Sequence, residues 1–199
     1  MNSRNRTPSE YIGYGLYLYF LGLSFRNVAK ALSFLHIVKI SHVSIWNWIQ
    51  KYKPQKLKKM NIDKYIIDET AIKAGSELIW LWIAIEPKDR EILSISISKE
   101  RNMFVAERFL SDIVNEYGEH PVSTDGGTWY PQACRFLKLN HHIHSFLEKS
   151  IIERTMQYIK DRTEIFDDYF PCKRNKCKLK HVKQWFNLFI DQHNKEIIS

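Results

Sequence analysis

The spacing of apolar residues changes near residue 62, and this change restricts the chain to a two-part architecture. In the first part, apolar side chains recur every three or four residues, as Phe25, Val28 and Leu32 do, which is the pattern of amphipathic helices. In the second part, short runs of β-branched and aromatic residues are separated by turn residues, which is the pattern of strands. We therefore expect a small all-α domain at residues 1–54, a basic linker at 55–61 and a larger α/β domain at 62–199.

Three short helices are expected in the first part. The first covers Tyr11–Leu21 and ends at Gly22, and Ser24 and Ser41 are suited to cap the second and third helices. Two closely joined amphipathic helices are typical of a helix-turn-helix module, in which the third helix enters the major groove of DNA. A plain three-helix bundle fits the same periodicity equally well.

The distribution of charge favours DNA binding over a plain bundle. Residues 1–61 contain ten Lys/Arg and one Asp/Glu, whereas the other 138 residues contain twenty Lys/Arg and twenty-one Asp/Glu. A basic first part beside a nearly neutral second part indicates a polyanion partner, with a merely soluble basic surface as the alternative. The residues expected to contact DNA are Arg26, Lys30, Ser44, Trp46, Asn47, Lys51 and, in the second part, Lys160.

The second part is expected to form a mixed five-stranded sheet flanked by helices. The predicted strands are 64–68, 78–85, 92–97, 120–124 and 140–144. The predicted helices are 103–116, 129–137, 148–163 and 182–193. Three consecutive strands with short turns predict an antiparallel meander, and the later alternation of strands and helices predicts an α/β arrangement.

Three acidic residues stand at positions that are unusual for surface charge. Asp68 ends one predicted strand, Asp125 comes directly after another, and Glu153 follows the apolar pair Ile151–Ile152 in a predicted helix. Taken singly, each has an ordinary explanation as a turn residue or a surface helix charge. Taken together, carboxylates at strand ends with one more on a neighbouring helix can hold divalent cations, which prefer oxygen ligands.

Several strings in this part, and two in the first, resemble insertion-sequence transposases of the IS-six type, and most of all their archaeal branch. They occur in order along nearly the whole chain: "LGLSFRNVAKAL", "VSIWNWIQKY", "IIDET.IK", "LWIAIEPKDREIL", "S..RN...A..FL", "STDGGTWYPQA" and "IIERTMQYIKDRTEIF". The resemblance implies a helix-turn-helix domain followed by a ribonuclease H-like catalytic domain. It implies that Asp68, Asp125 and Glu153 are the three catalytic acids of a DDE transposase.

The resemblance also implies the cofactors and partners. Two Mg²⁺ (or Mn²⁺) ions would be held by Asp68, Asp125 and Glu153, and the substrates would be the terminal inverted repeats of the element and target DNA. Two ends must be held together, so a homodimer or a larger synaptic complex is expected. The interval from Asp125 to Glu153 departs from the family pattern, because it is shorter than the roughly thirty-five residues of many DDE enzymes.

Two other functions remain open at this stage. One is a helix-turn-helix DNA-binding regulator whose second domain is catalytically inactive or domesticated. The other is a ribonuclease H-like nuclease that cuts DNA without joining it. The three cysteines, Cys134, Cys172 and Cys177, are too few for a secreted disulfide scaffold, and no signal peptide is evident. We therefore expect free thiols in a cytoplasmic, nucleoid-associated protein.

Overall fold

The computed structural model describes residues 7–35, 39–51, 53, 61–74, 77–164 and 179–198. The chain forms two compact units. The first unit contains Met1–Gln55 together with Gln184–Gln192, and the second contains Lys56–Lys183 together with His193–Ser199. The expected linker at 55–61 lies almost entirely outside the described residues.

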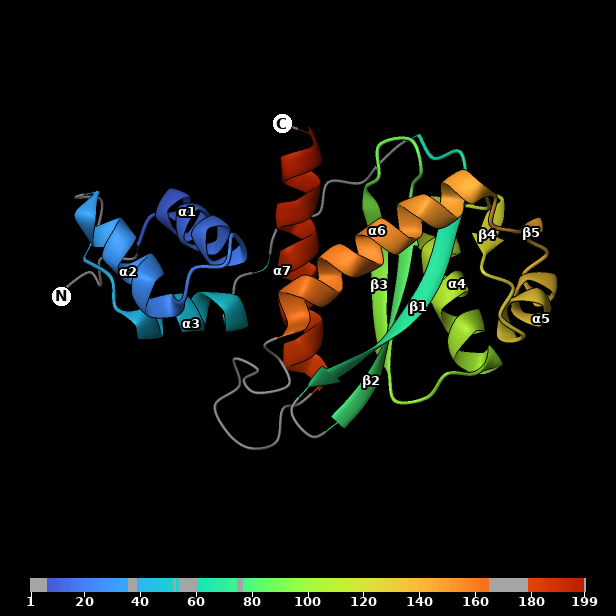
Figure 1. Cartoon of the computed structure of the whole chain (residues 1–199), viewed down its shortest axis with the longest axis horizontal. Helices are drawn as coiled ribbons and strands as arrows, with labels where there is room; N and C mark the ends of the chain where they lie inside the picture. The colour runs from blue at the N-terminus through green and yellow to red at the C-terminus, as the bar shows by residue number, and fades with distance from the viewer. Residues whose placement is uncertain are drawn as a thin grey trace. The chain divides into compact units, whose positions relative to one another are not determined.

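The first unit contains the three expected helices, α1 (Ser9–Phe20), α2 (Phe25–Phe34) and α3 (His42–Lys51) (Figure 1). Both expected caps are confirmed: the Ser24 hydroxyl accepts from the Asn27 N–H and the Ser41 hydroxyl accepts from the Ser44 N–H, each at 3.2 Å. These bonds satisfy N–H groups that the first turn of a helix leaves without partners.

A small apolar core joins the three helices. The buried side chains are those that the periodicity predicts, among them Val28 and Leu32 on α2 and Ile45 on α3. Gly15 of α1 lies against the Trp48 ring of α3, and a Cβ built on Gly15 would stand 2.7 Å from that ring. The missing side chain at Gly15 therefore allows α1 and α3 to approach.

Part of the C-terminal helix α7 (Leu179–Ile198) also belongs to the first unit. The Phe20 ring of α1 makes edge contacts with Trp185 and Phe189, at 5.2 and 6.0 Å between ring centroids. The Trp185 indole N–H donates to the Tyr19 hydroxyl at 3.0 Å. The expected limits placed all of residues 62–199 in the second domain, whereas these aromatic contacts group Gln184–Gln192 with the first unit.

The second unit is built on a five-stranded sheet in the order β3-β2-β1-β4-β5 (Figure 1). The strands are β1 (Tyr65–Ala74), β2 (Glu77–Ile85), β3 (Ile92–Ser98), β4 (Val122–Thr124) and β5 (His141–Ile143). β1, β2 and β3 are antiparallel neighbours, whereas β4 pairs parallel with both β1 and β5. The predictions of an antiparallel meander and of a mixed five-stranded sheet are confirmed.

β1 corrects one prediction. Asp68 was expected at the end of a strand, but β1 continues to Ala74 because it pairs with β2 along the whole of Ile66–Ala74. Its parallel pairing with β4, in contrast, involves only Tyr65 and Ile66. Asp68 therefore lies in the middle of a strand, just beyond the point where the parallel pairing ends.

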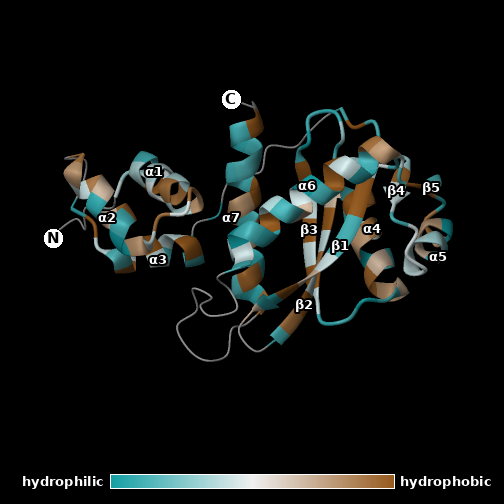
Figure 2. Ribbon diagram, in the orientation of Figure 1, coloured by the Kyte–Doolittle hydropathy of each residue, from teal (hydrophilic) through white to brown (hydrophobic). Residues whose placement is uncertain are grey.

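Helices cover both faces of this sheet. The helices of the second unit are α4 (Met103–Tyr117), α5 (Trp129–Phe136), α6 (Phe146–Thr163) and the remaining turns of α7. α6 crosses in front of β1 in Figure 1, and α4 lies behind the sheet. The strands are largely hydrophobic, while α6 shows many hydrophilic residues on its outward side (Figure 2).

One apolar core lies behind the sheet, on the side of α4 and α5. It joins Tyr65, Ile67 and Trp82 of the sheet to Phe109 of α4 and Tyr130 of α5, all of them fully or almost fully buried. Within it, the Trp82 indole N–H donates to the Ser98 hydroxyl at 2.8 Å. Since neighbouring strand residues point to opposite faces, Ile66 and Asp68 face the other side, where α6 packs against β1.

Two further expectations concern thiols and the membrane. Cys134 is a free, buried thiol as expected, and its burial raises its pKa to about 11; Cys172 and Cys177 lie outside the described residues. Among the described helices, none combines the length and the apolar character needed to cross a membrane.

Gly15 and Gly13 provide a test of the packing in the first unit. We expect Gly15→Ala to lower the free energy of unfolding by about 1–3 kcal/mol, because the added methyl overlaps the Trp48 ring. Gly13→Ala, with nothing within 4 Å of its built Cβ, is expected to raise it by about 0.5–1 kcal/mol. Urea unfolding of the two variants measures both changes in the free energy of unfolding. Equal changes in the two variants would contradict the close packing of Gly15 against the Trp48 ring.

Candidate metal centre

Asp68 and Asp125 are brought level with each other by the parallel pairing of β1 and β4. Tyr65 stands opposite Val122 and Ile66 opposite Ser123. Continued by three residues from the Tyr65–Val122 pair, the same register sets Asp68 of β1 opposite Asp125, which directly follows β4. Positions fifty-seven apart in the sequence thus become neighbours at one edge of the parallel pair.

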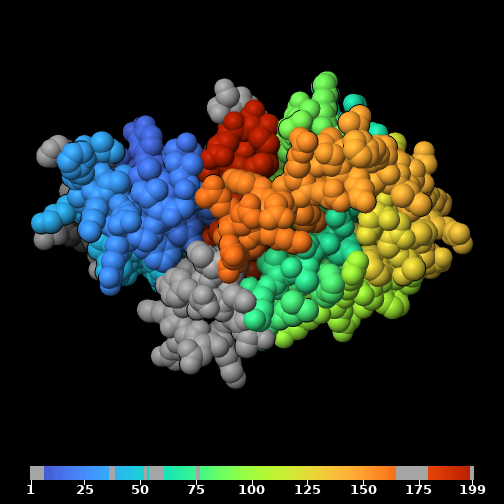
Figure 3. Space-filling view, viewed as in Figure 1, coloured from blue at the N-terminus to red at the C-terminus, as the bar shows by residue number. Residues whose placement is uncertain are grey.

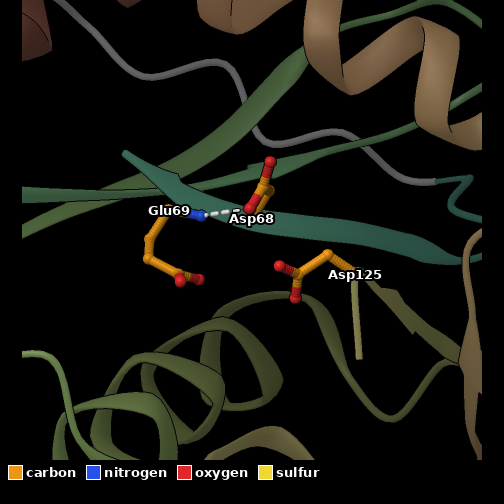
Figure 4. A group of neighbouring side chains, drawn as sticks. All are labelled: Asp68, Glu69 and Asp125. Atoms are coloured by element: carbon orange, nitrogen blue, oxygen red, sulfur yellow. Dashed lines mark hydrogen bonds between the residues drawn. The ribbon is translucent and has the colours of Figure 1, made fainter. Parts of the chain in front are cut away.

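These two carboxylates form a cluster with a third, that of Glu69. One carboxylate oxygen from each of the three lies within 4.8 Å of the others. In Figure 4, Asp68 and Glu69 point to opposite sides of β1, and the Asp125 carboxylate is drawn on the side to which Glu69 points. Asp125 is exposed, Asp68 is half-buried and Glu69 is buried. Figure 3 shows part of β1, in green, at the surface between α6, in orange, and the yellow segment around β4 and β5.

The surroundings of Asp68 oppose its ionisation. Burial raises its pKa to about 7, and the nearby charges of Glu69 and Asp125 act in the same direction. The Glu69 backbone N–H, which donates to Asp68 Oδ1 at 2.8 Å, and the Arg101 guanidinium act against this rise. A carboxylate destabilised in this way beside another carboxylate is a group that a divalent cation would stabilise.

Glu69 is already engaged by other side chains. Arg101, from the connection between β3 and α4, reaches Glu69 Oε1 with its Nη2 at 2.6 Å and its Nε at 2.7 Å. The Tyr130 hydroxyl of α5 donates to Glu69 Oε2. The side chain of Glu69 has no solvent exposure, so its charge is balanced inside the protein rather than by water.

The turn after β4 holds Asp125 in place. Gly126 has a φ of 88°, a conformation that glycine adopts readily and other residues rarely. The Gly127 N–H donates to Asp125 Oδ1 at 2.8 Å, and a Cβ on Gly127 would stand 2.7 Å from the Trp129 ring. The two glycines are therefore required by the shape of this turn.

Glu153 is the one predicted acid that the structure does not bring into the cluster. It lies in the middle of α6 with its side chain 63% exposed, and its carboxylate is 3.8 Å from the Lys149 ammonium. The preceding residue, Ile152, is buried. α6 packs against β1 on the face of the sheet towards which Asp68 points, so Glu153 is carried by a helix on the same face as that carboxylate. Its role as a catalytic and metal-binding acid stays a prediction.

A second acid on α6, Glu148, has a different position and a structural function. Burial opposes its ionisation, but the ammonium of Lys64, the backbone and hydroxyl of Ser145, and His142 together lower its pKa. Its Oε1 is 2.8 Å from Lys64 Nζ, and with Ser145 it forms a capping box at the start of α6. The helix that carries Glu153 is therefore tied at its first turn to Lys64, which immediately precedes β1.

The predicted DNA contacts lie in both units. Arg26, Lys30 and Lys51 are exposed, and Trp46 and Asn47 are half-buried. The Ser44 hydroxyl is 3.1 Å from that of Ser41, so it takes part in the cap of α3. In the second unit, the exposed Lys160 lines a groove of about 370 Å³ between β1 and α6. The other lining residues are Ala71, Ile72, Lys73, Gln157, Asp161, Thr163 and Glu164.

Sequence reasoning missed Glu69 and Arg101 as members of the site. Glu69 lies in a strand, and the residues two positions away on its face, Ile67 and Ala71, are apolar. A charged residue on an apolar face indicates a buried charge that needs a partner. Nothing in the sequence indicates that Arg101, thirty-two positions later, is that partner. Tyr130, which is fully buried, also joins the site through its bond to Glu69, and no sequence pattern indicates that bond.

Comparison with known proteins identifies a family for most of the chain. The sequence profile of the DDE domain of IS240 transposases matches residues 62–196. A protein of Methanocaldococcus jannaschii, described as uncharacterized protein MJ0017, is 34% identical over 197 residues, which cover 96% of this chain and 88% of that protein.

Two solved structures are similar to parts of this chain. The intasome of simian T-cell lymphotropic virus in complex with the PP2A regulatory subunit B56 gamma gives a TM-score of 0.49 at 19% identity, over 80% of this chain and 66% of that chain. The catalytic core domain of BIV integrase gives 0.47 at 14% identity, over 64% of this chain and 82% of that chain. The mixed sheet flanked by helices is of the ribonuclease H-like class that the resemblance implied.

The raised pKa of Asp68 predicts how stability depends on pH. Because the pKa is raised in the folded state, the protonated form stabilises the protein at low pH, and this contribution is lost as the pH rises from about 4 to about 7. In the absence of metal, Asp68→Asn is expected to raise the melting temperature at pH 8, on the order of 2–4 °C for each kcal/mol gained, and to have little effect at pH 4. Thermal unfolding at both pH values measures this. A variant less stable than the wild type at pH 8 would contradict the prediction.

Proposed function

Because this chain belongs to the family of IS240-type DDE transposases, we propose that it cuts DNA at the ends of an insertion sequence and joins those ends to target DNA. The observation that carries the proposal is the pairing of Asp68 with Asp125 at the edge where β1 and β4 part. Two carboxylates at that edge, one of them destabilised when ionised, form a site for a hard divalent cation.

The donor set fits magnesium or manganese. All of its atoms are carboxylate oxygens, and these are the ligands that such cations prefer. When bound, a pair of such ions would stabilise the attacking and leaving oxygens of a phosphodiester during in-line displacement. In this proposal Asp68 and Asp125 hold the ions, the half-buried position of Asp68 restricts access of water, and the glycine turn keeps the Asp125 carboxylate directed at β1.

We assign the third acidic position to Glu153. Support comes from its place on α6, the helix that packs on the face of β1 to which Asp68 points, and from its long, exposed side chain. The only described partner of its carboxylate is Lys149, at 3.8 Å on the surface. Such exposed pairs stabilise a protein by about 0–1 kcal/mol, which leaves the carboxylate available to a cation.

DNA is the proposed partner of both units. The exposed cations of α2 and α3 would contact the phosphates of the transposon ends, with Asn47 and Trp46 on α3 placed for base contacts. Lys160, in the groove beside β1, would contact the backbone near the cleavage site. Since two ends must be joined in one event, the active species is proposed to be a homodimer or a larger assembly in the cytoplasm.

Replacement of any one acid should remove activity and leave DNA binding. We expect Asp68→Asn, Asp125→Asn and Glu153→Gln each to lower strand transfer at least about a hundredfold, because ligands of one centre act together. Asp112→Asn, an exposed acid on α4, serves as the control and should transfer normally. The measurement is joining of a labelled transposon end to a plasmid in Mg²⁺, with end binding measured separately.

The same assay separates the proposed function from its alternatives. Binding without cutting by the unchanged protein would identify a DNA-binding regulator. Cutting without joining would identify a nuclease. Full transfer by Glu153→Gln alone would remove Glu153 from the site while leaving Asp68 and Asp125 in it.

The exposed cations of α2 can be tested through the salt dependence of binding. Arg26→Ala and Lys30→Ala are each expected to reduce the slope of log K against log salt by about 0.9, the value for one phosphate contact. Lys88→Ala, an exposed lysine in the turn between β2 and β3, should leave the slope unchanged. Unaltered slopes in both α2 variants would exclude this face of α2 from the DNA interface.

A further inference from the structure

We propose that Glu69, although it lies in the acidic cluster, is not a metal ligand, and that Glu69 and Arg101 form an internal ion pair that positions Asp68 and Asp125. This inference rests on the proposed function, because it assigns roles within the same site. In this inference Asp68 and Asp125 face a cation, and Glu69 holds the strands and the turn around them in position.

Both carboxylate oxygens of Glu69 are already engaged by other side chains. Oε1 accepts from the Nε and Nη2 of Arg101 at 2.7 and 2.6 Å, and Oε2 accepts from the Tyr130 hydroxyl. The side chain is fully buried. To become a ligand, Glu69 would have to leave the Arg101 guanidinium and the Tyr130 hydroxyl, and an unpaired buried charge or donor destabilises a protein strongly.

Strand geometry also separates Glu69 from its neighbour. Asp68 and Glu69 are adjacent on β1 and therefore point to opposite faces of the sheet, as Figure 4 shows. Glu69 points towards the core behind the sheet, where it meets Tyr130, while Asp68 points towards α6. The peptide between them contributes directly to the site, because the Glu69 N–H donates to Asp68 Oδ1 at 2.8 Å. Holding the Glu69 side chain therefore holds the N–H that orients Asp68.

Arg101 links Glu69 to the turn that holds Asp125. Its guanidinium stacks between two indole rings, 4.6 Å from the centroid of Trp80 on β2 and 4.1 Å from that of Trp129 on α5. Trp129 in turn packs against Gly127, whose N–H binds the Asp125 carboxylate. One cation thus touches β1 through Glu69, β2 through Trp80 and the start of α5 through Trp129.

The pair also sets the charge of the site. With Glu69 neutralised by Arg101, the carboxylates left to attract a cation are Asp68 and Asp125. Arginine suits this position because a planar guanidinium can bind a carboxylate with two N–H groups and stack on aromatic rings at once, which an ammonium cannot do.

The test compares two substitutions that remove the same charge from adjacent positions. Glu69→Gln keeps the size of the side chain, and its amide oxygen can still accept from Arg101 while its NH2 donates to the Tyr130 hydroxyl oxygen. Asp68→Asn is its matched counterpart. Mn²⁺ binding to the full-length protein without DNA is measured by the electron paramagnetic resonance of free Mn²⁺, with circular dichroism as the check on folding. We expect Glu69→Gln to bind Mn²⁺ at least about tenfold more tightly than Asp68→Asn does, because only Asp68 is a ligand.

Each outcome has a definite meaning. Affinities of the two variants that differ by less than tenfold, with both weaker than the wild type, would overturn the inference, because loss of a pair that only positions Asp68 and Asp125 is expected to weaken binding less than loss of a ligand. Wild-type affinity in Asp68→Asn would overturn the metal site itself, and with it the proposed function. Failure of the inference about Glu69 is therefore distinguishable from failure of the proposed function.

A second measurement needs no variant and applies if Glu69→Gln does not fold. Crystals of the unchanged protein soaked in MnCl₂ locate the ion by anomalous scattering. We expect the ion at Asp68 and Asp125, with both Glu69 oxygens still bonded to Arg101 and Tyr130. A Glu69 oxygen at the bond length of a hard cation, about 2.1 Å, would overturn the inference.

Discussion

The parallel pairing of β1 with β4 is the interaction on which the candidate site depends. It is short, since only Tyr65 and Ile66 of β1 take part, yet its register determines which residues meet beyond its end. A shift of one residue would turn Asp68 to the core behind the sheet and bring Glu69 to the face of α6. The register is held by the core behind the sheet, where Tyr65 and Ile67 of β1 and Val122 of β4 are buried with the side chains of α4 and α5.

Crowded carboxylates are the cost of such an arrangement, and the protein offsets it by local pairing. Glu69 is paired with Arg101 and Tyr130, and Glu148 with Lys64 and the first turn of α6. Asp68 and Asp125 receive only backbone N–H groups among their described hydrogen bonds. The two acids with cationic partners thus hold elements together, and the two without them are the ones that face the proposed ions.

Much of the fold was predictable because it follows local rules. The periodicity of α2 and α3, the serine caps, the three antiparallel strands and the span of α4 all depend on residues within a few positions of one another. The extent of β1 was not predictable in the same way. Lys64–Asp68 has a strand pattern of its own, whereas the continuation to Ala74 depends on pairing with β2. The division of α7 between the units depends on aromatic contacts with α1, far away in the sequence.

The sequence by itself determined the class of protein, the order of its elements and the two aspartates, because strand and helix periods, turn glycines and resemblance to a family are properties of short segments. The tertiary structure alone decided that Asp68 and Asp125 are neighbours, that Glu69 joins them and that Arg101 is the partner of Glu69. Those facts depend on strand register and on which way each side chain points. Charged groups distant in the chain are brought into contact only when the sheet has formed, so no local pattern could have disclosed the ion pair beside the two acids.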